Sequence, residues 1–139
     1  MRRLLSPHRP GALALGLLTI AALGVLVAGF QHARLFHRGY AQVEIVGLLF
    51  FMNALGSTVV VLALVVRRVW VFVLGVLSIC APSLVSIALS HSSRGFLGFH
   101  EGGYDPDALV IVVAELAAVV FALVGAVIAL SDRPAGAAP

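Results

Sequence analysis

The sequence predicts an all-α membrane protein in which four antiparallel helices form a transmembrane bundle. The chain has 139 residues, of which 61% are hydrophobic and only 11% are charged, and its mean hydropathy is +1.11. Soluble domains carry about a quarter charged residues. The charges are confined to short gaps, which leaves four long apolar stretches at residues 10–33, 45–66, 69–93 and 108–131. Because about 20 apolar residues in a helix span the hydrocarbon core of a bilayer, each stretch predicts one transmembrane helix.

The gaps between these stretches set the bounds of the elements. We expect helices at about residues 11–30, 42–66, 69–90 and 107–131, within one domain over residues 11–131. The first stretch is longer than the apolar core of a signal peptide, so we expect a retained anchor helix. Arg67 and Arg68 leave almost no loop between the second and third helices, which predicts a tight hairpin. Asp105 is expected to cap the fourth helix, because Pro106 suits the first helical position.

The distribution of Arg predicts the orientation in the membrane. Six of the nine Arg belong to the N-terminal tail (residues 1–10), the hairpin and the C-terminal tail (residues 132–139), and three to the longer connections. Since positive charge is retained in the cytoplasm, we expect both termini there. Abundant Arg without Lys is typical of a high-GC bacterium, which predicts the bacterial inner membrane. Arg at helix ends can face lipid headgroups, which argues against a nucleic-acid partner. The Pro-, Ala- and Gly-rich C-terminal tail is expected to be disordered.

Small residues recur at helical spacing and predict the faces on which the helices pack. In the fourth helix the spacing alternates between three and four residues, which is the period of a left-handed bundle. This seam consists of Ile111, Glu115, Ala118, Ala122, Gly125 and Ala129. The other helices carry Gly24, Ala28, Asn53, Gly56, Ser57, Gly75, Ser78, Pro82 and Ser86. Because lipid gives membrane helices no hydrophobic drive to associate, close contact across small residues holds them together.

One carboxyl group, that of Glu115, lies inside a predicted transmembrane helix. It is eight residues from Asp107, which places it roughly 12 Å from the outer end of the helix. Asn53 and Ser78 reach a similar depth and Ser57 follows Asn53 by one turn, so these residues are expected to form an intramembrane polar layer. Three interpretations stay open for the carboxyl. It is neutral and hydrogen-bonds its neighbours, it handles a proton or a cation, or it faces a water-filled crevice.

Histidine and acidic residues gather in the two connections expected outside the membrane. The candidates are His32, His37, Glu44, His91, His100 and Glu101. Imidazole and carboxylate groups suit zinc, copper or iron, but no two of these His have the spacing of a helical metal motif. A metal site and a hydrated, titratable surface therefore remain alternatives. Residues 91–106 also carry aromatic residues between glycines, so we expect this segment to fold over the outer mouth of the bundle.

The last third of the chain carries a resemblance. Ser93-Arg94, Gly98-Phe99-His100-Glu101 and Asp105-Pro106 lead into an apolar helix that bears Glu115. This pattern resembles the third connection and fourth helix of small four-helix membrane proteins of high-GC bacteria, a group without an established activity. The resemblance implies the four-helix fold and supplies no reaction or cofactor. Small multidrug exporters share the length and helix count but carry their coupling Glu in the first helix, where this chain has none.

The sequence contains no nucleophile elbow, phosphate loop, zinc motif or haem-attachment motif, so we expect neither an enzyme nor a cofactor. The leading interpretation is a small structural or accessory protein of the lipid bilayer. It would associate with itself as a homo-oligomer, or with a larger membrane complex, through its small-residue helix faces. The alternative is a proton-linked or metal-linked small carrier built on Glu115 and the outer His and acidic residues.

Overall fold

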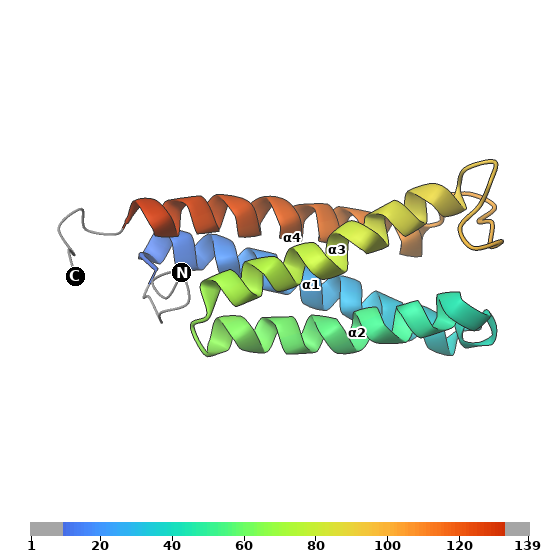
Figure 1. The fold of residues 1–139 in the computed structure, drawn as a ribbon, viewed down its shortest axis with the longest axis horizontal. Helices are drawn as coiled ribbons and strands as arrows, with labels where there is room; N and C mark the ends of the chain where they lie inside the picture. Colours follow the sequence, from blue (N-terminus) through green and yellow to red (C-terminus); the bar gives the residue numbers. More distant parts are fainter. Residues whose placement is uncertain (1–9, 133–139) are drawn as a thin grey trace.

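The computed structural model describes residues 10–132, within which four long helices form an antiparallel bundle (Figure 1). The helices are α1 (Ala12–His37), α2 (Glu44–Val65), α3 (Val69–Ser90) and α4 (Pro106–Ser131), with a short 3-10 helix, η1 (Tyr40–Gln42), before α2. All four long helices in this part of the chain are long and apolar enough to cross a membrane. The prediction of an all-α transmembrane bundle is therefore confirmed. Apart from residues 10 and 132, the expected tails at residues 1–10 and 132–139 lie outside the described residues.

The first helix is longer than the sequence predicted. The helix was expected to end at about Phe30, but α1 continues to His37. No Gly or Pro interrupts the chain between residue 30 and Gly39, whose φ of 138° is a conformation that mainly glycine adopts. The placement of His32 and His37 in an outer connection was therefore wrong, because both lie on α1.

The two ends of the bundle differ in their connections. At one end, here called the hairpin end, α1 begins, α4 ends and residues 66–68 join α2 to α3 (Figure 1). Arg67 has a φ of 60°, and the Arg68 N–H donates to a carbonyl group in the last turn of α2 at 2.8 Å. These features close the tight turn. The opposite end, here called the loop end, carries the longer connections at residues 38–43 and 91–105.

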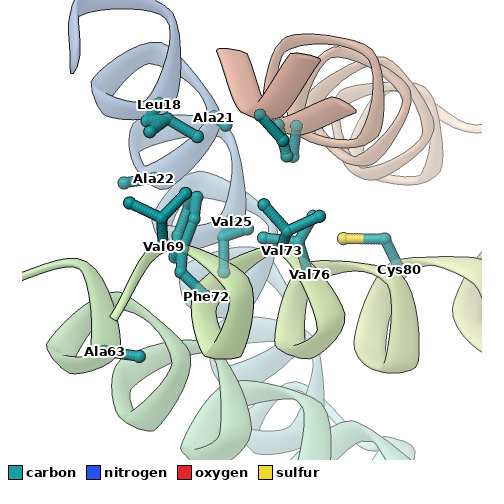
Figure 2. Close-up of a cluster of buried hydrophobic side chains, with 13 residues drawn as sticks. Leu18, Ala21, Ala22, Val25, Ala63, Val69, Phe72, Val73, Val76 and Cys80 are labelled. Atoms are coloured by element: carbon teal, nitrogen blue, oxygen red, sulfur yellow. The ribbon is translucent and has the colours of Figure 1, made fainter. Parts of the chain in front are cut away.

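An apolar core fills the hairpin-end half of the bundle, and Figure 2 shows its side chains meeting from the surrounding helices. Its buried members are Leu18, Ala21, Ala22, Val25, Ala63, Val69, Phe72, Val73, Val76, Cys80, Ala118, Ala122 and Ala126. Phe72 is the largest of the fully buried side chains. Most of the other buried members of this core are Ala and Val, so Phe72 contributes a larger side chain to it than any of them.

The helices α1 and α4 share the most extensive interface. The predicted seam of α4 is buried along its whole length, from Ile111 to Ala129. A Cβ atom on Gly24 of α1 would lie 2.7 Å from the Ala114 carbonyl oxygen, a separation that side chains do not tolerate. The seam of small residues therefore packs inside the protein, where it brings two backbones together.

In contrast, α2 and α3 separate toward the loop end (Figure 1). They meet near the hairpin, where Gly75 of α3 packs against Val60 of α2. Pro82 lies inside α3, and a proline in a helix removes one backbone hydrogen bond and bends the helix axis. This separation leaves space between the two helices in the loop-end half, and the candidate site lies there.

Candidate functional site

Glu115 is completely buried on α4, with its closest polar partner on α2. The Asn53 side-chain amide donates to Oε1 of Glu115 at 3.3 Å, and the Ser57 hydroxyl donates to the Asn53 amide oxygen at 3.3 Å. The second carboxyl oxygen, Oε2 of Glu115, has no hydrogen-bond partner among residues 10–132. A buried carboxyl group thus keeps one oxygen available for a proton or another donor.

Two more helices contribute side chains to this cluster. Ser83 of α3 interacts with the Glu115 carboxyl group, and its hydroxyl lies 3.4 Å from Nε2 of His32 on α1. The Nδ1 atom of His32 lies 2.9 Å from the Ala28 carbonyl oxygen, which can only accept a hydrogen bond, so Nδ1 carries the proton. Each of the four helices therefore supplies at least one member of a continuous chain of polar groups, and α2 supplies two. This chain is here called the polar cluster: His32, Asn53, Ser57, Ser83 and Glu115.

Ser78 lies outside the polar cluster, although the sequence predicted it there. Its side chain is exposed, and its hydroxyl donates to the Gly75 carbonyl oxygen at 2.9 Å. Ser83 takes its place, because five residues along a helix turn the side chain by roughly 140°. The sequence does contain a signal for Ser83, since Ser86 and Ser90 follow it at helical spacing and line the same cavity.

A cavity of about 390 Å³ lies between α2 and α3 in the loop-end half of the bundle. The apolar part of its wall includes Leu49, Phe50, Met52, Ile79, Pro82 and Ile87. His32, Asn53 and Ser83 form a polar part of the wall, and Glu115 lies directly behind them. Met52 and Pro82 line the cavity and are exposed, so the cavity opens sideways between α2 and α3.

Tyr40 and Glu101 come together at the loop end of the cavity, which both residues line. This contact is here called the latch. The Tyr40 hydroxyl donates to the Glu101 carboxylate. The Tyr40 ring stacks on the Phe50 ring with a centroid separation of 4.6 Å, and its centroid lies 5.8 Å from that of Phe99 in an edge-to-face arrangement. Burial raises the pKa of the Tyr40 phenol, and the hydrogen bond to Glu101 adds to this shift. The phenol therefore remains an effective donor at neutral pH.

The segment that carries Glu101 is folded, as the sequence predicted. Phe96 and Phe99 exchange two backbone hydrogen bonds of 2.8 Å, and the residues between them, Leu97 and Gly98, have φ angles of 51° and 80°. Two positive φ angles are typical of a two-residue hairpin turn. The Glu101 N–H donates to a carbonyl group at the end of α3 at 3.0 Å. The turn is thus tied to the bundle at its loop end.

The other histidine and acidic candidates do not join the polar cluster, although His91 lines the cavity. His37 and Glu44 are exposed, as is His100, whose Nε2 lies 3.4 Å from the Ser93 carbonyl oxygen. His91 stacks on Tyr104 with a ring separation of 3.8 Å. Among residues 10–132, no three His, Cys, Asp or Glu side chains come together in an arrangement that could hold a metal ion.

The start of α4 shows two kinds of carboxylate contact. Asp105 caps the helix, because its side chain accepts a hydrogen bond from the Ala108 N–H at 2.7 Å, and Pro106 occupies the first helical position. Asp107, two residues further on, pairs with Arg34 at 3.0 Å and with Arg38 at 3.1 Å. The sequence indicated the cap but not these ion pairs, because α1 was expected to end before Arg34.

The chain matches no protein-family model, no curated protein and no solved structure. Evidence for its function therefore comes from its own residues.

Proposed function

We propose that this protein is a small proton-linked membrane carrier that binds an amphipathic cation in the cavity between α2 and α3. The observation that carries the proposal is the buried Glu115 carboxyl group, whose Oε2 has no hydrogen-bond partner among the described residues. Its neighbours Asn53 and Ser83 line the cavity. An ionised carboxylate inside a membrane costs about 2.5–3.5 kcal/mol on insertion scales, and acidic residues there commonly serve a proton or ion path.

The chemistry of the cavity supports an amphipathic ligand. Most of the wall is apolar, which suits a hydrocarbon or aromatic body, and polar side chains converge on one region only. There, the Asn53 amide oxygen, the Ser83 hydroxyl and Nε2 of His32 can accept or exchange hydrogen bonds. A ligand with one polar, cationic end matches this distribution, and the sideways opening allows entry from the membrane.

Proton coupling follows from the single acid in the polar cluster. A carboxylate in apolar surroundings needs a compensating positive charge, which either a bound proton or a bound cation provides. If the two compete for Glu115, release of the proton favours binding of the cation, and the reverse. That competition is the thermodynamic basis of exchange. The metal-linked form of the carrier has less support, because no cluster of three metal ligands occurs within residues 10–132.

The rival proposal is an accessory protein that associates with partners through small-residue helix faces. It has less support, because the main face of this kind, the α4 seam, packs inside the bundle. The seam of α4 from Ala118 to Ala129 is buried inside the bundle, so it is not available to a partner. Gly24 of α1 is likewise packed against α4. Close packing of α1 against α4 is compatible with a carrier, in which it would form a rigid frame beside the binding site.

For the cellular setting, we propose the inner membrane of a bacterium, with both termini in the cytoplasm and the loop end outside. The excess of Arg in the tails and the hairpin supports this orientation. Reporter fusions after Arg68 should read cytoplasmic, and a fusion within residues 95–103 should read external. An external reading after Arg68 would reverse the orientation while leaving the cavity proposal intact.

The first test asks whether Glu115 senses an occupant of the cavity. An apolar carbodiimide, which attacks protonated carboxyl groups within membranes, should label Glu115 in purified protein, and benzyltrimethylammonium should slow this labelling. Neopentylbenzene, the uncharged analogue of the same shape, should protect much less. Labelling of Glu115 that no quaternary ammonium ion slows would contradict the proposed site.

The second test measures transport. Proteoliposomes with an acidic interior should accumulate benzyltrimethylammonium as protons leave, and Glu115→Gln should reduce this uptake to the level of protein-free liposomes. Glu44→Gln, which removes an exposed carboxylate at the start of α2, is the matched control and should transport normally. Equal uptake by the Glu115→Gln protein would exclude the carrier mechanism in this form.

A further inference from the structure

A second candidate site lies on the opposite side of α1, where three charged residues meet at the loop end. Nη1 of Arg34 lies 3.0 Å from Oδ1 of Asp107, and Nη1 of Arg38 lies 3.1 Å from Oδ2. The Gln31 side-chain amide also donates to Oδ1 of Asp107 at 3.2 Å and accepts from Arg34 at 3.2 Å. One carboxylate thus holds two guanidinium groups side by side.

The charges in this group do not balance. Two guanidinium groups carry two positive charges, and Asp107 supplies one negative charge through oxygens that are both occupied. The Arg34 side chain is 37% exposed and the Arg38 side chain 55% exposed. Each guanidinium has five N–H donors in a fixed planar array, so donors remain on both groups beyond those that contact Asp107. The surplus charge and donors suit a phosphate oxyanion.

An apolar groove runs from this charged group toward the middle of the membrane. It is lined by Leu23, Leu26, Val27, Phe30 and Gln31 of α1 and by Val110 of α4. From Leu23 to Arg34 there are eleven residues, or roughly 16 Å of helix, which is about half the thickness of the hydrocarbon core. Gln31 belongs to both the groove and the charged group. The groove and the charged group together therefore span about one leaflet, with the charged group at the depth of the headgroups.

We propose that Arg34, Arg38 and this groove form a binding site for one anionic phospholipid. The lipid phosphate would bridge the two guanidinium groups, and one acyl chain would lie along α1 between Leu23 and Phe30. Asp107 is then a positioning residue, because it keeps both guanidinium groups at the same place on the surface. The attraction of cations to the C-terminal end of α1 accounts for the positive charge alone, whereas the lipid accounts for the charge, the free donors and the adjoining groove together.

The test compares two lipids with identical acyl chains. Purified protein in a neutral detergent is mixed with phosphatidylglycerol or phosphatidylcholine, and bound lipid is counted by native mass spectrometry. The wild type should retain phosphatidylglycerol preferentially. The double variant Arg34→Gln/Arg38→Gln should bind it about 25-fold more weakly, since each Arg near an anionic surface contributes about a fivefold factor.

The matched control is Arg94→Gln, which removes an exposed Arg from the same end of the bundle and should bind phosphatidylglycerol like the wild type. If the double variant does not fold, Arg38→Gln alone keeps the Arg34–Asp107 pair and should weaken binding about fivefold. Equal retention of the two lipids by the wild type, or an equal loss in Arg94→Gln, would overturn the proposal. Complete displacement by millimolar inorganic phosphate would identify a free-anion site and would also overturn it.

Discussion

The two halves of the bundle are built from the same four helices but bury different chemistry. In the hairpin-end half, the core cluster consists of apolar side chains such as Leu18, Val25 and Phe72. In the loop-end half, the fully or nearly buried residues include His32, Ser57 and Glu115. The change occurs along single helices, because the α4 seam runs from Glu115 into a series of Ala and Gly residues. The buried polar groups and the apolar core therefore lie at different depths along the membrane normal.

This difference separates the half in which close helix packing stabilises the fold from the half in which a ligand can bind. Small residues let α1 and α4 approach closely in the hairpin-end half, where Gly125 of α4 packs against Leu18 of α1. Toward the loop end α2 and α3 separate, and the cavity and the polar cluster occupy that space. We expect substitutions in the first half to reduce stability more than substitutions in the second half, whose main effect should be on binding. Three experiments test this division.

The largest effect is expected for Phe72→Ala in the hairpin-end half. Phe72 is completely buried, and removal of such a ring costs about 3–5 kcal/mol through lost contacts and the cavity left behind. We expect the lower part of this range, because the unfolded reference state in a membrane is itself surrounded by apolar lipid. Reversible unfolding in mixed micelles measures the change.

Leu74→Ala is the matched control for this experiment. Leu74 lies on the same helix but is mostly exposed to the membrane, so its truncation exchanges protein–lipid contacts for other lipid contacts. Its free energy of unfolding should change by less than about 0.5 kcal/mol. Comparable losses in the two variants would show that burial in this core contributes little, and the proposed division of the bundle would fail.

An intermediate effect on the free energy of unfolding is expected at Glu115, where two substitutions distinguish the role of its hydrogen bond from that of its ionisable group. Glu115→Leu leaves the Asn53 amide without its partner inside the membrane, so we expect a loss of about 1–2 kcal/mol in the free energy of unfolding. Glu115→Gln retains a hydrogen-bonding group of the same shape and should be nearly neutral for stability. A large loss in Glu115→Gln would mean that the carboxyl stabilises the fold, and the loop-end half would then resemble the hairpin-end half.

Several features could be predicted because they depend on helical periodicity or on depth alone. The α4 seam follows a repeat of three and four residues, and that repeat fixes which side of a packed helix faces inward. Asn53 and Glu115 were expected at the same depth, since the position of a residue in a spanning helix gives its height in the membrane. Asp105 was recognisable from local chemistry, because Asp before Pro is typical of a helix start.

Other features depend on tertiary structure and could not be predicted in this way. Depth does not give rotation about the helix axis, which is why Ser78 was chosen and Ser83 was missed. Polar residues at the end of an apolar stretch do not stop a helix, so α1 continued beyond His32 and buried it. The cavity arises from the angle between α2 and α3, which is set by packing across the bundle. The Tyr40–Glu101 latch joins residues 61 positions apart, and no local sequence pattern predicts it.

The smallest effect is expected at this latch. Tyr40→Phe removes the hydrogen bond to Glu101 but keeps the ring that stacks on Phe50, so the free energy of unfolding should fall by only about 0.5–1.5 kcal/mol. Amide exchange should accelerate at residues 95–101 and stay unchanged in the hairpin-end half. Unchanged exchange at residues 95–101 would show that the latch does not hold this turn.

The same latch predicts a dependence on pH. Because folding raises the pKa of the Tyr40 phenol, the fold favours the protonated form. The stability that Tyr40 contributes should therefore be complete below the ordinary tyrosine pKa of about 10 and should be lost as the pH rises above it. In the Tyr104→Phe protein, Tyr40 is the remaining tyrosine of the two in the chain. Ultraviolet absorbance should then detect phenolate only above the pH at which the unfolded protein ionises. Ionisation at the same pH in both states would show that Tyr40 is neither buried nor bonded to Glu101 in the folded protein.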